Sequence, residues 1–176
     1  ILIRAMQVAA ICTEARLVRR GDRYQTQGDP TETALLVAAA KAGIIREELL
    51  RQMKPVAEQP VDSGRKIMSV TVGGSFGERL LCKGAPDLLL DRCSRVAVPG
   101  GSRAMTAADR RTIAQEATRM AGGALRVIGL AEGEDPSLGE EGMTFLGLAG
   151  MIGPPRPEVP LAVRQSRRAG IRPVLV

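Results

Sequence analysis

The sequence predicts an α+β domain in which helices flank an antiparallel β-sheet. Several short apolar segments rich in β-branched residues are separated by turns that contain glycine or proline. Segments with helix start and stop signals occur between them, mostly one at a time, which favours strands joined by turns or single helices. The 44% apolar and 25% charged content is typical of a globular core, and with 2% aromatic residues we expect that core to be aliphatic.

The first third of the chain predicts helices on either side of one hairpin. Gly21 lies between two polar-apolar segments and marks the turn of the hairpin. Asp29 is a helix cap, and Pro30 fits the first turn, where its missing N–H has no partner to lose. We expect, in chain order, a buried helix over 1–12, a hairpin of 15–20 with 23–27, a helix from Pro30 to Gly43 and a short helix over 46–53.

The middle of the chain predicts most of the sheet. Pro55 and Pro60 interrupt the chain before the first strong strand pattern, and Thr106 is placed to cap a long polar helix. We expect strands over 67–72, 78–83 and 95–98, helices over 87–93 and 106–120, and strands over 125–131 and 143–152.

The tail changes character. Prolines at 154, 155 and 157 break the chain, 158–169 predicts a helix and 171–176 a strand, which together form half of a parallel α/β unit. We therefore divide the chain into a main domain, 1–152, and a hinge with the start of a second domain, 153–176.

Composition excludes several classes of function. No apolar run approaches the roughly 20 residues of a membrane-spanning helix. Cys12, Cys82 and Cys93 have no zinc-ligand spacing and the chain has no histidine, so we expect no metal site and a reducing cytosol. The net charge of +6 favours a polyanionic partner, but the basic residues are scattered and aromatic residues are few, which argues against nucleic acid. The start at Ile1, with no secretory signal, leads us to expect a piece of a longer protein.

Four separated segments carry the functional signal. They are Gly-Asp-Pro-Thr-Glu-Thr-Ala-Leu-Leu at 28–36, Ser-Gly-Arg-Lys-Ile-Met-Ser-Val at 63–70, Cys-Lys-Gly-Ala-Pro-Asp from 82, and Ala-Leu-Arg-Val-Ile at 124–128. In this order they resemble the nucleotide-binding domain of P-type cation-transporting ATPases of type II. The segments are slightly more similar to the calcium-type members than to the sodium/potassium-type members. Any one of them alone is a weak signal.

The resemblance implies a role for Glu32 as acceptor for the adenine amino group. Spacing alone favours another role, because Glu32 is the third helical residue after Asp29 and fits a capping box. Both roles stay open at this point.

The resemblance also implies the rest of a nucleotide pocket. Lys66 matches a lysine that lines the adenine and phosphate cleft, and Lys83 matches a lysine whose charge lies against the nucleotide. Gly84 matches a glycine that packs under adenine, and Arg126 matches an arginine that reaches the ribose and β-phosphate. Val61 stands where the family has a phenylalanine that stacks on adenine. The loss of stacking is expected to cost ~1–3 kcal/mol, and Phe76 and Tyr24 are the nearby rings that could replace it.

The function implied is to hold ATP, with Mg²⁺, and present it to a phosphorylatable aspartate in the phosphorylation domain. The family's Asp-Lys-Thr-Gly-Thr motif is not in these 176 residues, so we expect no catalytic residue here, and binding without turnover. The implied partners are the phosphorylation and actuator domains of the same parent chain, at the cytoplasmic face of a membrane that the parent reaches through helices outside this sequence. Gly153 replaces an aspartate at the family's hinge.

Two alternatives remain. One is a degenerate domain of the same fold, kept for structural or regulatory contacts with little or no nucleotide binding, which Val61 and Gly153 favour. The other is a basic nucleic-acid-binding domain, which would show a strongly salt-dependent affinity.

Overall fold

The computed structural model describes residues 1–176 except 22, 63, 75–76, 154–156 and 175–176. The helices are α1 (Leu2–Ile11), α2 (Pro30–Lys41), α3 (Arg46–Gln52), α4 (Pro86–Arg92), α5 (Ala107–Gly122) and α6 (Val159–Arg168), with a short 3₁₀ helix at Pro136–Leu138. The strands are β1 (Arg16–Arg20), β2 (Arg23–Gln27), β3 (Lys54–Gln59), β4 (Ile67–Gly74), β5 (Gly77–Gly84), β6 (Cys93–Val98), β7 (Gly101–Ala104), β8 (Arg126–Gly133) and β9 (Met143–Met151).

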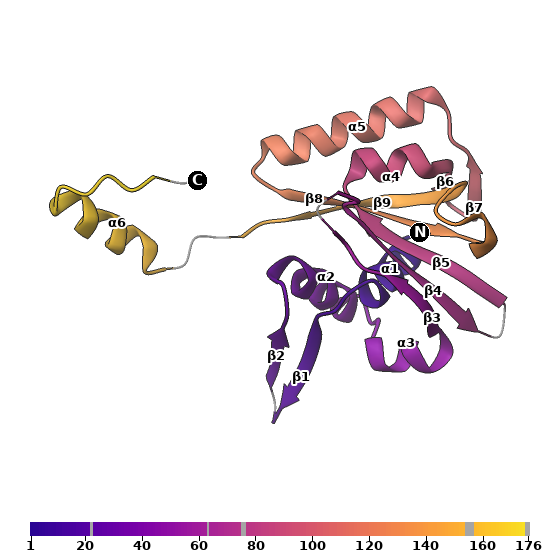
Figure 1. The fold of residues 1–176 in the computed structure, drawn as a ribbon, viewed down its shortest axis with the longest axis horizontal. Helices are drawn as coiled ribbons and strands as arrows, with labels where there is room; N and C mark the ends of the chain where they lie inside the picture. The colour runs from indigo at the N-terminus through magenta and orange to yellow at the C-terminus, as the bar shows by residue number, and fades with distance from the viewer. Residues whose placement is uncertain (22, 63, 75–76, 154–156, 175–176) are drawn as a thin grey trace.

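A seven-stranded sheet with the order β3-β4-β5-β8-β9-β6-β7 forms the centre of the fold. Helices α4 and α5 cover one face, and α1, α2 and α3 lie on the other, where the separate hairpin β1–β2 projects (Figure 1). All neighbouring strands are antiparallel except β6 and β9, which are parallel. The prediction of an α+β fold with an antiparallel sheet is confirmed, and the parallel pair is an addition that the sequence did not indicate.

The core has two layers because the central strands are buried on both faces. Met68 and Leu81 point into the layer under α1, α2 and α3, whereas Ile67 and Cys82, their neighbours along the strands, pack with Leu89 of α4. Successive side chains of a strand point to opposite faces. Burial on both faces explains why these strands have continuous apolar runs rather than a clean alternation.

Two edge strands were missed. The sequence predicts a break around Pro55, but β3 pairs there with β4, and all six of its residues are exposed. A proline, which has no N–H to donate, is tolerated in an edge strand. The short β7 at the opposite edge follows the predicted turn at 99–101. The sequence signal for such strands is weak, because they form by pairing with a neighbouring strand and not by burial of apolar side chains.

Two terminal expectations need correction. The helix over 1–12 is buried only in its second half, since Ile1, Leu2 and Ile3 are about half exposed. The strand expected over 171–176 is not formed at 171–174, and the remainder lies outside the described residues. Helix α6 lies away from the sheet (Figure 1), and no strand in the described part of the chain pairs with this segment. None of the helices in the described part of the chain is long and apolar enough to cross a membrane.

The pairing of β4 with β5 depends on a close approach at Gly84. Gly84 pairs with Ile67, and a Cβ added at Gly84 would lie 2.6 Å from the carbonyl oxygen of Lys66 and 2.9 Å from the Cα of Ile67. Lys66 has a left-handed backbone with φ of 53°, and its carbonyl accepts a hydrogen bond from the N–H of Ala85 at 3.0 Å. The backbone of β4 therefore occupies the space that any side chain at 84 would need.

We predict that Gly84→Ala lowers the free energy of unfolding by ~1–3 kcal/mol, as an overpacked site with little freedom to relax does. Urea denaturation measures the change. Gly101→Ala is the control, since nothing lies within 4 Å of its added Cβ and its φ is not positive. Equal stability of the two variants would contradict the predicted clash.

A buried carboxylate joins α1 to the sheet. Glu132 of β8 is 1% exposed and forms ion pairs with Arg4 of α1 and Arg79 of β5. Two arginine partners compensate the cost of removing the carboxylate from water. The pairs span 128 and 53 residues of sequence, so they tie three separate elements together.

We predict that Glu132→Gln destabilises the fold by ~1–3 kcal/mol, because one amide cannot satisfy two arginines and its NH₂ is itself a buried donor. Glu134→Gln at an exposed position one residue past β8 removes the same charge and is the control. Thermal or urea unfolding measures both variants, and an unchanged stability of Glu132→Gln would show that the ion pairs contribute nothing.

Candidate functional site

One cavity of about 700 Å³ contains every residue that the sequence assigns to a binding site. It lies where the starts of α2, β4 and β8 meet the end of β5. Its lining residues are Glu14, Gly28, Asp29, Thr31, Glu32, Val61, Lys66, Met68, Lys83, Gly84, Ala85, Pro86, Arg126, Val127 and Ile128. The four sequence segments, up to about 100 residues apart in the chain, thus contribute to a single site.

Glu32 is the most firmly held side chain of the cavity. Its Oε1 accepts from the ammonium of Lys83 at 2.5 Å. Its Oε2 accepts from the backbone N–H of Glu14 at 2.9 Å and from the hydroxyl of Thr13 at 3.2 Å. Three donors, one from β5 and two from the turn after α1, therefore set the position of this carboxylate, and within the described residues no donor comes from its own helix.

This arrangement rules out the capping-box role that spacing favours for Glu32. Asp29 caps α2 by accepting from the N–H of Thr31 at 2.8 Å and of Glu32 at 3.4 Å. The Glu32 carboxylate does not return to the cap but points to Lys83 and the turn after α1. The capping box is absent here and present instead at Thr106 with Asp109, where Thr106 was predicted as a cap.

The electrostatics of the site keep two carboxylates ionised. Partial burial, the largest single effect, raises the pKa of Glu32, but the hydrogen bond and charge of Lys83 with the donors of Glu14 and Thr13 outweigh it. Slight burial likewise raises the pKa of Asp29, while its cap hydrogen bonds and the charge of Arg126 lower it. Both pKa values lie below their ordinary range, so both groups are pure hydrogen-bond acceptors at neutral pH.

The two lysines enter the cavity from paired strands. Lys83, near the end of β5, is 7% exposed and pairs in register with Met68 of β4. Lys66 precedes β4 and is exposed, and its left-handed backbone is held by hydrogen bonds of its N–H to Asp62 and its carbonyl to Ala85. The antiparallel pairing of the start of β4 with the end of β5 brings both cations to the same end of the two strands.

Arg126 and Val61, which are far apart in the chain, also line the cavity. Arg126, the first residue of β8, is exposed and close enough to Asp29 to lower its pKa. Within the described residues no hydrogen bond or ion pair holds the charged ends of Arg126 and Lys66. Val61 is 56% exposed, so its side chain is open to a ligand in the cavity that it lines.

Gly84 has a structural role in addition to the one implied by resemblance. It lines the cavity, but its missing side chain is required by the backbone of Lys66 and Ile67, whether or not a ligand is present. Gly28 has a similar constraint: its φ is 121°, and an added Cβ would lie 2.9 Å from the Cα of Ala15. Both glycines are therefore explained by chain packing around the cavity.

Sequence reasoning missed the turn that follows α1. Thr13 and Glu14 have no motif spacing to the other segments, and Thr13 is 3% exposed, an ordinary buried polar residue on its own. Arg46 at the start of α3 donates to the carbonyls of Ala10 at 3.0 Å and Thr13 at 3.2 Å and so holds this turn in place. Only the tertiary contact to Glu32 gives the turn a place in the site.

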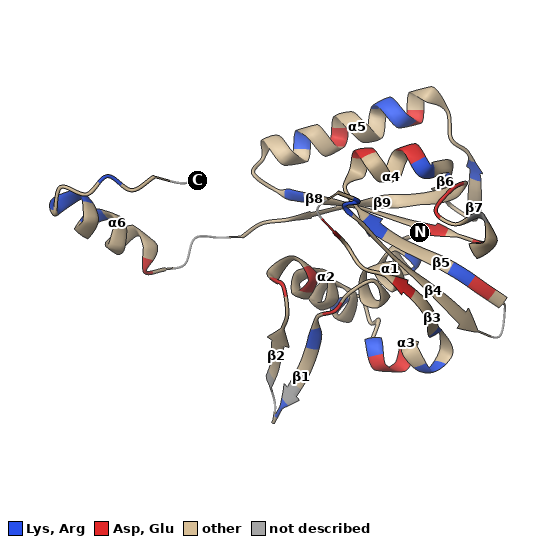
Figure 2. Ribbon diagram, viewed as in Figure 1, with Lys and Arg blue, Asp and Glu red and all other residues tan. Residues whose placement is uncertain are grey.

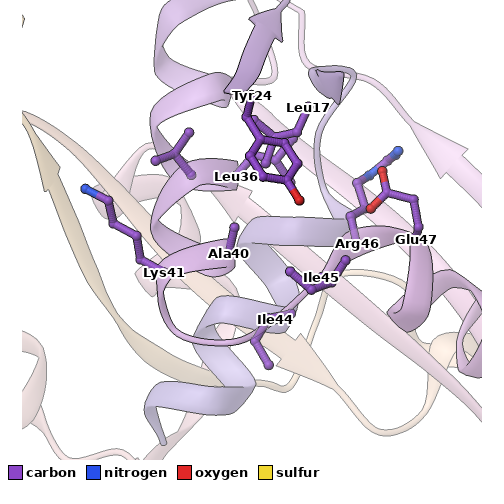
Figure 3. Close-up of a pocket in the computed structure, with 10 residues that line it drawn as sticks. Leu17, Tyr24, Leu36, Ala40, Lys41, Ile44, Ile45, Arg46 and Glu47 are labelled. Carbon is purple, nitrogen blue, oxygen red and sulfur yellow. The ribbon is translucent and has the colours of Figure 1, made fainter. Parts of the chain in front are cut away.

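Of the two rings considered as a replacement for the missing aromatic residue, Tyr24 lies outside this cavity. Tyr24 of β2 is 67% exposed and lines a second cavity of about 580 Å³ between the hairpin, α2 and α3 (Figure 3). Ala40, Ile44 and Ile45 form much of the other wall of that cavity. Phe76 lies outside the described residues. At the position where the family has a stacking phenylalanine, the cavity is lined by Val61.

The chemistry of the main cavity fits a ligand that has an anionic group at one end and, at the other, a flat apolar group that carries a hydrogen-bond donor. Its lining has as many carboxylates (Glu14, Asp29 and Glu32) as cations (Lys66, Lys83 and Arg126). Lys83 is paired with Glu32, whereas the charged ends of Lys66 and Arg126 have no ion-pair partner in the described structure and can meet an anion. The Glu32 carboxylate offers an acceptor. Val61 and Met68 supply apolar surface. Among the residues that the structure describes, no three His, Cys, Asp or Glu side chains form a group that could hold a metal ion.

Comparison with known proteins identifies the family. Residues 2–158 match the family described as P-type ATPase, cytoplasmic domain N. A calcium-transporting ATPase of Bacillus subtilis (strain 168) is 40% identical over 95% of this chain and 20% of its own length. Calcium-transporting ATPase 1 of Bacillus cereus (strain ATCC 10987 / NRS 248) is 37% identical over 85% and 18%, and the cation-transporting ATPase pma1 of Synechocystis (strain ATCC 27184 / PCC 6803 / Kazusa) is 35% identical over 97% and 19%.

The chain spans about a fifth of the length of these relatives. The family match nevertheless covers α1 to α5 and the whole sheet, and it includes all six residues predicted for the site. The protein therefore belongs to the family of P-type ATPase cytoplasmic N domains.

Proposed function

We propose that this chain binds ATP in the cavity at the edge of the sheet and presents it to the rest of a P-type cation pump. The observation that carries the proposal is the meeting of Glu32, Lys66, Lys83 and Arg126 in one cavity of about 700 Å³. This volume lies in the range of pockets that hold ligands of nucleotide size. The alternative of a degenerate domain has less support, because all of the charged groups expected of the pocket are in place.

The charges support one orientation of the nucleotide. Glu32, an ionised acceptor, suits the amino group of adenine, and the buried Lys83 lies beside it. Lys66 and Arg126 are exposed and, in the described structure, unpaired by hydrogen bonds, so they are available to phosphate oxygens. A guanidinium offers a fork of donors suited to phosphate. Adenine would then lie between Val61 and the β4–β5 edge, with the phosphates towards Arg126.

The remaining assignments concern the whole parent protein. Because two of the compared relatives are named calcium-transporting ATPases, we propose a calcium-type pump at the cytoplasmic face of a membrane, using ATP with Mg²⁺. Residues 1–152 form the nucleotide-binding domain in this proposal, and 153–176 the hinge and start of the phosphorylation domain. The scattered basic residues, interspersed with acidic ones (Figure 2), give no support to nucleic-acid binding.

We predict that ATP shifts the amide NMR signals of residues around the cavity, and that Arg126→Gln weakens this binding roughly 10- to 100-fold. The estimate follows from the ~1.5–3 kcal/mol of a hydrogen bond to a charged group. Adenine, which has neither ribose nor phosphate, is expected to bind the wild type and Arg126→Gln equally. Arg111→Gln on the exposed part of α5 removes the same charge and is the control. No shifts with ATP at millimolar concentration would favour the degenerate domain.

We also predict that Val61→Phe tightens ATP binding about 10-fold, because a ring at 61 restores stacking on the base, worth ~1–3 kcal/mol. Calorimetry measures the affinity. Val56→Phe in β3 is the matched control: Val56 is 60% exposed and does not line the cavity. A similar gain in both variants would mean that added apolar surface, and not a ring at 61, improves binding.

A further inference from the structure

The turn after α1 holds the Glu32 carboxylate by two donors on one oxygen. Thr13 Oγ1 lies 3.2 Å from Glu32 Oε2, and the backbone N of Glu14 lies 2.9 Å from the same atom. Glu32 Oε1 has a single partner within the described structure, the ammonium of Lys83 at 2.5 Å. Each carboxylate oxygen accepts about two hydrogen bonds. Oε2 is therefore fully occupied, and Oε1 keeps a place for one further donor.

The proton of the Thr13 hydroxyl has a defined direction. The N–H of Ala15 donates to Thr13 Oγ1 at 3.1 Å, so the hydroxyl already accepts one hydrogen bond. Its own proton is then free to point at the ionised Glu32. Thr13 is 3% exposed, so bulk water has little access to this hydroxyl. The hydroxyl thus acts as a fixed donor to the carboxylate.

The rest of the turn is equally constrained. The Arg46 guanidinium donates to the carbonyls of Ala10 and Thr13, which fastens the turn to the start of α3. Cys12, the residue before Thr13, is fully buried, and its thiol donates to the carbonyl of Leu81 in β5. The position of Thr13 is therefore set from both sides, and Glu32 is positioned by a rigid support rather than by Lys83 alone.

We propose that Thr13 is a positioning residue that makes the site select a 6-amino purine over a 6-oxo purine. The inference rests on the proposed function, because it concerns the base of the nucleotide bound there. With Oε2 occupied by Thr13 and Glu14, Oε1 is the atom of Glu32 that meets the base. An acceptor that is held in place rewards the amino group of adenine and repels the 6-oxygen of hypoxanthine. A site that hydrogen-bonds one substrate group discriminates strongly against an analogue that lacks it.

The test compares ATP with ITP, which differ at this position of the base, in Thr13→Val and Thr13→Ser. Valine keeps the shape of threonine but has no hydroxyl, and serine keeps the hydroxyl. We expect Thr13→Val to weaken ATP about 5- to 10-fold, which is less than the loss of a whole hydrogen bond to a charged group because Glu32 keeps its donors from Glu14 and Lys83. We expect the affinity for ITP to change less than about 2-fold. Thr13→Ser is expected to keep the wild-type ratio of the two affinities.

A purely structural role predicts a different result. Thr13→Val also removes the acceptor for the Ala15 N–H and can weaken the fold, but such a loss lowers both affinities equally. Thr33→Val removes a hydroxyl from the same helix as Glu32 that bonds only to the carbonyl of Pro30, and serves as control. Equal losses for ATP and ITP, or a Thr13→Ser variant that behaves as Thr13→Val, would overturn the proposal.

A second measurement needs no nucleotide. The ¹³C shift of the Glu32 carboxyl, followed against pH, reports the pKa of this group directly. Removal of a donor to the charged form is expected to raise that pKa in Thr13→Val and not in Thr13→Ser. An unchanged value would show that the hydroxyl does not hold Glu32. If wild type binds neither nucleotide, the proposed function fails, while this titration still decides whether Thr13 positions the carboxylate.

Discussion

The contact of β5 with β4 at Gly84 is the constraint on which the site depends. The backbone of Lys66 and Ile67 fills the space beside Gly84, and this close approach sets the register that brings Lys66 and Lys83 to the same edge of the sheet. The left-handed backbone of Lys66 belongs to the same contact. A glycine that resembles a ligand-binding residue is here required first by the chain itself, and the cavity follows from the packing.

The Glu32–Lys83 pair connects that sheet edge to the helical layer. Lys83 comes from β5, Glu32 from the first turn of α2, and the turn after α1 supplies the other donors. A partly buried ion pair is stable only when its remaining lone pairs and protons are satisfied. The Thr13 hydroxyl and the Glu14 N–H meet this condition on one side of Glu32. The same contacts that keep the pair stable leave one carboxylate oxygen directed to the cavity.

The balance of polar and apolar contacts in the cavity is unusual for a site expected to hold a base. All the charged residues predicted for the pocket line the cavity. The exposed Val61 stands where a stacking ring was expected, and Tyr24 lines another cavity. A valine offers less contact area than a ring and no π-face. The cations and Glu32 would therefore carry a larger share of nucleotide recognition than in a pocket with an aromatic wall, and base selection would depend on how well Glu32 is positioned.

The sequence alone determined the elements with strong local signals: the cap at Asp29, the helix begun at Thr106, the central strands and the six residues that meet in one cavity. The sequence did not predict the edge strand β3, because Pro55 disfavours a strand and only the pairing with β4 forms one there. The direction of the Glu32 side chain and the parts played by Thr13 and Gly84 were decided only by tertiary structure. Each depends on atoms far away in the chain, such as the contact of Glu32 with Lys83 across 51 residues, and local propensity contains no information about such contacts.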